Sequence, residues 1–253
     1  MQGVWGAGFW GAVGGSALVL GAAIAWIASL PQRLIAAIMA IGSGVLISAV
    51  AFDLMDEAFE QGGFDSTAIG FLGGAVIYTA ANIIVSRRGA RHRKRSGSNP
   101  DARQPHAEAS SGVAIAIGAL LDGIPESIVI GVSLLDGGGV NAVTVAAVFL
   151  SNVPEGLSSA AGMKKAGRSA AYVFGVWGGI ALASGVAAMI GNVALAGASP
   201  DAIAAVTALA AGAILAMLVD TMIPEATEAT HDYSGLIAVT GFLLAFVLSK
   251  SGG

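Results

Sequence analysis

Residues 111–135 read SGVAIAIGALLDGIPESIVIGVSLL, an apolar stretch in which Asp122 and Glu126 are the charged residues. A helix needs about 20 mainly apolar residues to cross the hydrocarbon core of a membrane. This stretch is long enough, and both carboxylates fall well inside it. The stretch therefore predicts a membrane-spanning helix that carries charged groups at a depth where unpaired charges are costly.

The rest of the chain repeats this pattern. Of its 253 residues, 55% are hydrophobic and 11% are charged, whereas a soluble domain carries roughly 25% charged residues. Residues 87–110 are polar and basic, and we expect them to form a flexible loop. The sequence predicts one all-α integral membrane domain over residues 1–253, with eight transmembrane helices. The expected helices are residues 4–28, 34–59, 66–86, 111–135, 140–162, 169–195, 201–224 and 235–250.

The basic residues predict how these helices cross the membrane. Cytoplasmic loops of membrane proteins carry an excess of Lys and Arg. If the N-terminus lies outside, all of the twelve Lys and Arg residues except Lys250 fall on the cytoplasmic side. We therefore expect a multi-pass protein of the cell membrane, with residues 87–110 in the cytoplasm and both termini extracytoplasmic. No basic residues precede the first apolar segment, so we expect a permanent helix there rather than a signal peptide.

Two helical segments resemble each other near their ends. Residues 52–58 read FDLMDEA, and residues 219–226 read VDTMIPEA. In the predicted topology the first runs outward and the second inward, and similar segments in opposite orientations are typical of inverted-repeat transporters. The pattern predicts a 3+2+3 bundle in which the helices at 111–135 and 140–162 form the central pair.

The two central helices share a Pro-Glu motif. Residues 121–127 read LDGIPES, and residues 150–156 read LSNVPEG. Each proline removes a helix hydrogen bond and frees the carbonyl four residues earlier. Asp122 lies four residues before Glu126, and Ser151 and Asn152 lie four and three residues before Glu155, so each set shares a helix face. This spacing predicts a mid-membrane cluster of oxygen ligands for a cation; the alternative is two proline kinks with neutral, hydrogen-bonded glutamates.

This pattern resembles the metal-site motif of ZIP (Zrt/Irt-like) transporters, His-Asn-x-Pro-Glu-Gly, in the fourth and fifth helices of that family. Residues 152–156 match it, but Ser151 stands at the histidine position, and in the other helix Asp122 does so. The resemblance implies a ZIP-like bundle and an intramembrane metal site at Asp122, Glu126 and Glu155, with Asn152 or Ser151. A second metal position of the family loses one ligand here, because Gly123 replaces asparagine.

Oxygen ligands alone suit harder ions such as Mn²⁺, Mg²⁺, Ca²⁺ or Fe²⁺, while Zn²⁺ is the ion that the resemblance implies. These two considerations favour different ions, so the identity of the transported metal is not predicted. Asp53 and Asp220 are further metal-site candidates that we expect to line the pathway, and the alternative is a solvated helix end. Glu225 and Glu228 lie on one helix face near His231 and predict either an exit site or a polar cap.

The resulting hypothesis is transport of divalent metal cations into the cytoplasm by alternating access. The protein would then be no enzyme and would need no cofactor beyond the transported ion. Two alternatives are a ZIP-like protein that binds or senses metal without turnover, and an intramembrane hydrolase. Expected partners are metal ions and the lipid bilayer, not nucleic acid. The GxxxG patterns at residues 70–74 and 175–179 indicate either a homodimer face or close internal packing.

Overall fold

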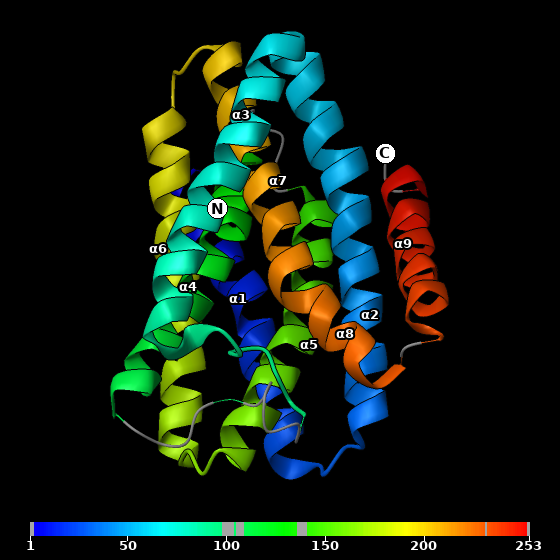
Figure 1. Ribbon diagram of the computed structural model, residues 1–253. Helices are drawn as coiled ribbons and strands as arrows, with labels where there is room; N and C mark the ends of the chain where they lie inside the picture. Colours follow the sequence, from blue (N-terminus) through cyan, green and yellow to red (C-terminus); the bar gives the residue numbers. More distant parts are fainter. Residues whose placement is uncertain (1–2, 98–103, 105–108, 136–140, 231, 252–253) are drawn as a thin grey trace.

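The computed structural model describes residues 3–97, 104, 109–135, 141–230 and 232–251, and the elements in them are all helical (Figure 1). The predicted all-α class is confirmed. The α-helices are α1 (Val4–Ile27), α2 (Gln32–Ala49), α3 (Met55–Val85), α4 (Ala109–Val132), α5 (Ala142–Lys165), α6 (Ala170–Leu195), α7 (Pro200–Met217), α8 (Ile223–Thr230) and α9 (Ser234–Ser251). Three short π-helical segments join or extend them: η1 (Val50–Leu54), η2 (Ser86–Ala90) and η3 (Leu218–Met222).

Six helical stretches in the described part of the chain are long and apolar enough to cross a membrane. Helix α5 has 24 residues but is not among them, because polar side chains such as Ser151, Asn152 and Glu155 lie in its interior. The architecture is consistent with a multi-pass membrane protein. The six stretches are Val4–Ile27, Gln32–Ala90, Val113–Val132, Ala170–Leu195, Pro200–Thr230 and Ser234–Ser251.

The outer surface of the helices differs from that of a soluble protein, although the interior is also mainly apolar. Large apolar side chains point outward from α3 and α9, whereas acidic side chains of α4 and α5 are buried. A soluble protein seldom exposes such extended apolar faces, and faces of this kind are consistent with contact with lipid. The exposed apolar residues of these two helices include Ile69, Leu72, Val76, Leu236, Val239 and Leu243.

The long stretch Gln32–Ala90 folds back on itself. Its 59 residues would span about 88 Å as a straight helix, roughly three times the hydrocarbon thickness. Gly63 interrupts it with a φ of 68° and a non-helical ψ, a conformation that glycine adopts at no steric cost. Figure 1 shows the blue-to-cyan chain rising to this point and returning alongside α7.

Two long helices each contain a π-helical segment with one acidic residue. Asp53 lies in η1, between α2 and α3, and Asp220 lies in η3, between α7 and α8. Such single π turns occur frequently at functional sites. The expected helix at 201–224 also runs further than predicted, because α8 extends it to Thr230.

Small residues let the helices pack at short distance. The main pairs are α3 with α7, α2 with α9, α1 with α5 and α6, and α4 with α6. Gly70 and Gly74 lie directly against the backbone of Ala205 and Leu209 in α7, so this GxxxG pattern serves internal packing. Gly175 and Gly179 face open space instead.

We expect Gly74→Ala to lower the melting temperature of the purified protein. A Cβ at this position would collide with the Leu209 carbonyl oxygen, and overpacking of this kind costs about 1–3 kcal/mol. The neighbouring Gly73 has nothing within 4 Å of such a Cβ, so Gly73→Ala is the matched control. Equal thermal unfolding of both variants in detergent would contradict the close α3–α7 contact.

The start of the basic segment is not a free loop. After η2 the chain turns inward, and Arg93, Lys94 and Ser96 are buried. We call residues 93–96 the strap. The expectation of a flexible loop over 87–110 is therefore wrong for these residues, because buried carboxylates hold them in place. Residues 98–103 and 105–108 lie outside the described part of the chain.

Candidate functional site

The site begins with three carboxylates buried between the Pro-Glu helices. Asp122 and Glu126 in α4 are each 1% exposed, and Glu155 in α5 is 3% exposed. Pro125 and Pro154 both lie inside their helices. A buried ionised carboxylate is costly unless a charge or hydrogen-bond donor compensates it. Carboxylates that stay ionised in this arrangement need cations or hydrogen-bond donors beside them.

Lys94 supplies one of these cations. Its Nζ lies 3.2 Å from Oδ2 of Asp122 and 2.8 Å from Oε2 of Glu155. The lysine side chain is 3% exposed, so water screens these two contacts little. One ammonium group thus joins the carboxylates of α4 and α5.

Arg93 supplies the second cation. Its Nε and Nη2 donate to Oδ2 and Oδ1 of Asp122 at 2.8 and 2.7 Å, the two-pronged geometry that makes arginine–carboxylate pairs strong. The Tyr78 hydroxyl also donates to Oδ1, at 2.6 Å. Burial alone would lower the pKa of Arg93, but the Asp122 carboxylate outweighs it, so the pKa is raised and the guanidinium stays charged.

A chain of hydrogen bonds continues from Arg93 to Asp220. Nη1 of Arg93 donates to Oδ1 of Asn82 at 3.0 Å, and Nδ2 of Asn82 donates to Oδ2 of Asp220 at 3.1 Å. Asp220 is exposed and borders a polar cavity of about 250 Å³. Lys94 borders the same cavity, so this cavity reaches the carboxylate site. Its lining residues are Arg91, His92, Lys94, Arg95, Asp220, Thr221 and Pro224.

Glu126 is placed differently from the other two acids. Among the described residues, neither of its oxygens accepts a hydrogen bond of good geometry. It borders a small, mostly apolar cavity together with Asp53 and Thr144. Asp53 is half-buried and accepts a hydrogen bond of 2.6 Å from Ser249 in α9. Asp53 and Glu126 are therefore neighbours of one cavity, on the side of the site away from the strap.

Asn152 and Ser151 are buried, and each donates a hydrogen bond to a helix carbonyl, while the Asn152 amide also lies beside the Glu126 carboxylate. The Asn152 amide donates to the Gly14 carbonyl of α1 at 3.1 Å, and the Ser151 hydroxyl donates to the Val148 carbonyl at 2.9 Å. Asn152 thus ties α5 to α1. The Ser151 hydroxyl bonds a carbonyl of its own helix, α5.

Side chains from α5 hold the strap's backbone in place. Ser159 donates to the Arg93 carbonyl at 2.6 Å, and Ser158 donates to the Lys94 carbonyl at 2.7 Å. Gln104 donates to the carbonyls of Arg93 and Arg95 at 2.9 and 3.1 Å. These donors satisfy a non-helical backbone that is buried within the protein, as buried polar groups require.

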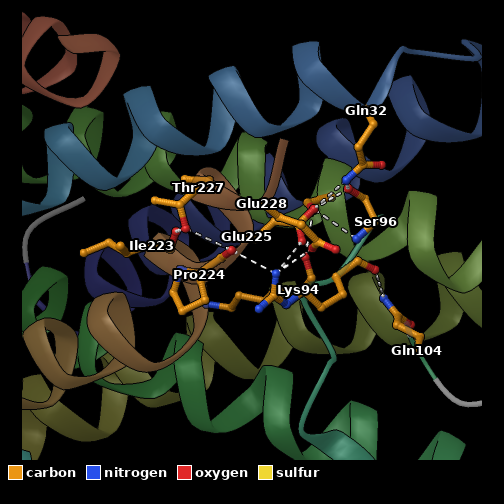
Figure 2. A network of polar contacts seen from close by, with 12 residues as sticks. Gln32, Lys94, Ser96, Gln104, Ile223, Pro224, Glu225, Thr227 and Glu228 are labelled. Atoms are coloured by element: carbon orange, nitrogen blue, oxygen red, sulfur yellow. Dashed lines mark hydrogen bonds and ion pairs between the residues drawn. The ribbon is translucent and has the colours of Figure 1, made fainter. Parts of the chain in front are cut away.

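Glu225 in α8 is fully buried and binds the last residue of the strap (Figure 2). Its Oε1 accepts from the Ser96 backbone at 3.0 Å and from the Ser96 hydroxyl, and it lies 2.9 Å from the Ser158 hydroxyl, whose one proton it shares with the Lys94 carbonyl. Arg95 bonds the neighbouring Glu228 at 2.6 Å. Glu225 and Glu228, expected at an exit site or a polar cap, thus hold the strap; His231 lies outside the described residues.

The structure brings Asp122 and Glu155 together through Lys94, and it links Asp220 to them through Asn82 and Arg93. The residues missed by sequence reasoning are Arg93 and Lys94 of the strap, Tyr78, and the donors Ser158 and Ser159. One signal was present: the eight expected helices held one basic residue, Lys250 at the end of the last, while seven of the basic residues lay between 87 and 103. Because acids inside a membrane protein are usually paired, the basic residues between 87 and 103 were the candidates for their partners.

In the described residues no three His, Asp or Glu side chains are arranged to hold a metal ion. Arg93 and Lys94 instead occupy the oxygens of Asp122 and one oxygen of Glu155. The site as it stands binds two positive charges that belong to the chain itself. Comparison of the sequence with protein-family models and with curated proteins gives no match.

Proposed function

We propose that this protein transports divalent metal cations across a membrane, through the carboxylates between α4 and α5. The observation that carries the proposal is the Lys94 ammonium, which lies between Asp122 and Glu155 deep in a helical bundle. Such a position stabilises positive charge where lipid and apolar side chains exclude water. Acidic residues at this depth mark ion pathways in membrane proteins.

The arrangement of helices supports a ZIP-like 3+2+3 bundle with eight crossings. Gln32–Ala90 counts as two crossings because of the break at Gly63, and α5 counts as the eighth. An inverted repeat would exchange α2 with α7 and α3 with α9, and the observed pairs α2–α9 and α3–α7 are equivalent under that exchange. The π-helical segments around Asp53 and Asp220 are equivalent in the same way.

The basic end of the bundle would face the cytoplasm, as the excess of Lys and Arg favours. Lys164 donates to the Trp26 carbonyl at 2.7 Å, and Lys165 donates to the Ser96 carbonyl at 2.6 Å. These contacts bring the α1–α2 connection, the strap and the end of α5 to one end of the bundle. With eight crossings of the cell membrane, both termini would be extracytoplasmic.

The polar cavity supports a pathway that enters the site from one end. It reaches Lys94 from the basic end, whereas on the other side the cavity shared by Asp53 and Glu126 has a volume of about 10 Å³ and is closed. Alternating access would open one side at a time. The oxygen ligands suit Mn²⁺, Fe²⁺ or other hard divalent ions, and Zn²⁺ is the ion implied by the ZIP resemblance.

We expect proteoliposomes containing the purified protein to accumulate Mn²⁺, Fe²⁺ or Zn²⁺ with saturable kinetics. Liposomes without protein, and protein-containing liposomes offered Na⁺ or K⁺, are the controls. A fluorescent metal indicator or a radioactive isotope inside the liposomes measures the uptake. Absence of uptake for every divalent ion offered would contradict transport.

One observation favours a second function, metal binding or sensing without turnover. Asp122 is engaged by Arg93, Tyr78 and Lys94 at once, and the strap behind them is held by α5 and α8. Because Asp122 is so fully paired, the Arg93 and Lys94 side chains would rarely leave the site to admit a metal ion. Binding of a divalent ion by the purified protein, without any uptake into proteoliposomes, would favour this function.

A further inference from the structure

Lys94 and a transported divalent cation would need the same atoms. The ammonium contacts Oδ2 of Asp122 and Oε2 of Glu155. A divalent ion with oxygen ligands sits about 2.0–2.6 Å from each of them, so it would overlap the Lys94 position. The ammonium and the ion therefore exclude each other.

Two of the three cations of the strap, Arg93 and Lys94, lie at the carboxylate site and match the charge of one divalent ion, whereas Arg95 pairs with Glu228 outside it. Arg93 and Lys94 bring two positive charges to the three buried acids Asp122, Glu126 and Glu155. One divalent cation in their place leaves the net charge of the interior unchanged. A monovalent cation would leave one more negative charge uncompensated away from water, which is costly. The exchange therefore favours divalent over monovalent ions.

The helices are shaped to receive the strap. Gly162 of α5 lies where the Arg95 carbonyl crosses the helix, and Gly118 of α4 lies against the Arg93 side chain. A Cβ at either glycine would collide with these groups. Together with the bonds from Ser158, Ser159 and Glu225, these contacts define a fitted groove for the strap.

A cavity beside the strap offers space into which the strap could withdraw. Lys94 borders the polar cavity at the basic end, and Arg91 and Arg95 border it too. A strap that moves into this cavity would free both carboxylates. It would also uncover Ser96, which is fully buried against Glu225.

We propose that the strap, residues 93–96, is a tethered counter-cation that competes with the transported ion and closes the site from the basic end. The proposal rests on the proposed transport function and deepens it. Binding of a divalent ion at Asp122 and Glu155 requires the strap to withdraw. Return of the strap expels the ion from the site.

The first test is the affinity for Mn²⁺ of the purified protein in detergent, measured by titration calorimetry. Lys94→Met removes the ammonium and keeps the apolar stem. In the wild type, most molecules would have the Lys94 ammonium at the site, and only the small remaining fraction could bind Mn²⁺, which weakens the apparent affinity. Removal of the ammonium removes this competition, so the Kd of Lys94→Met is expected to fall about tenfold or more. Lys164→Met is the matched control, since Lys164 bonds the Trp26 carbonyl at the same end; its Kd is expected to equal that of the wild type.

The second test follows the position of the strap. The chain has no cysteine, so Ser96→Cys introduces a single thiol at a buried position. Maleimide is expected to label it slowly, and saturating Mn²⁺ is expected to raise the rate about tenfold or more, as a shift of the strap population requires. Ser251→Cys, at an exposed position of α9, is the control whose rate should not respond to Mn²⁺.

A variant that displaces the strap by steric clash alone shows whether labelling of Ser96→Cys reports the position of the strap rather than ion binding. Gly162→Ala, placed in the Ser96→Cys background, changes no charged group but obstructs the Arg95 carbonyl. It is expected to raise labelling without Mn²⁺. Gly175→Ala, at a helix glycine that faces open space, should leave labelling unchanged.

These measurements do not depend on uptake. A lower Kd for Lys94→Met together with Mn²⁺-stimulated labelling supports the strap proposal, and it does so even if proteoliposomes take up no ion. An unchanged or higher Kd for Lys94→Met, or labelling that ignores saturating Mn²⁺, overturns the strap proposal. Uptake by the wild type in that case would leave the transport function standing.

Discussion

Glu155→Gln is expected to reduce divalent-cation uptake to the level of liposomes without protein. The change keeps the size of the side chain but removes the negative charge that α5 contributes to the site. Glu155 is 3% exposed and contacts the internal ammonium of Lys94 at 2.8 Å. Loss of an outer-shell partner already costs about 10–100-fold in metal affinity, and loss of a direct ligand is expected to cost more. Initial rates of Mn²⁺ uptake measure the effect.

Glu60→Gln is the matched control for this variant. It makes the same chemical change at an exposed position of α3, and uptake should stay at the wild-type rate. Full uptake by Glu155→Gln would mean that the ion does not pass between α4 and α5. The Pro-Glu motifs would then be structural kinks, and the resemblance to ZIP transporters would concern the fold alone.

The helices could be predicted because their signals are local. An apolar run near 20 residues, ended by Gly, Pro or charged residues, specifies a helix without knowledge of its neighbours. Segments such as 169–195 therefore lie within a residue or so of the observed α6. Gly63 was placed in a break for the same reason.

The strap could not be predicted from local signals. Arg93 and Lys94 belong to a basic run beside Ser, Gly and Pro, and such a run usually forms a solvated loop. Its burial depends on Asp122 and Glu155, which come later in the chain. The relevant clue was non-local, since interior acids required partners and the expected helices contained one basic residue, Lys250 at the end of the last.

Spacing along a helix also did not determine which polar groups meet at the site. Ser151 lies four residues before Glu155 and shares its face, yet its hydroxyl bonds the Val148 carbonyl. A serine inside a helix can always bond a carbonyl of the preceding turn. Asn152 bonds Gly14 because α1 packs closely on α5. These choices depend on neighbouring helices that the sequence of α5 does not contain.

Asp122→Leu is expected to be the most destabilising substitution in the protein. It leaves the Arg93 guanidinium buried without its carboxylate, and removing one partner of a buried ion pair costs about 3–5 kcal/mol. Arg93→Met should cost less, because Asp122 keeps the Lys94 ammonium and the Tyr78 hydroxyl. Thermal unfolding of the purified variants in detergent measures both effects.

The double variant Arg93→Met/Asp122→Leu tests whether these losses come from the pair itself. It removes both charges and leaves Lys94 paired with Glu155, so it should be more stable than Asp122→Leu alone. Residues in one buried network show coupling energies of about 0.5–3 kcal/mol. Simple addition of the two single losses would mean that the residues act independently. In that case the two-pronged contact would not be what holds the strap in the bundle, and its anchors would be Ser158, Ser159 and Glu225.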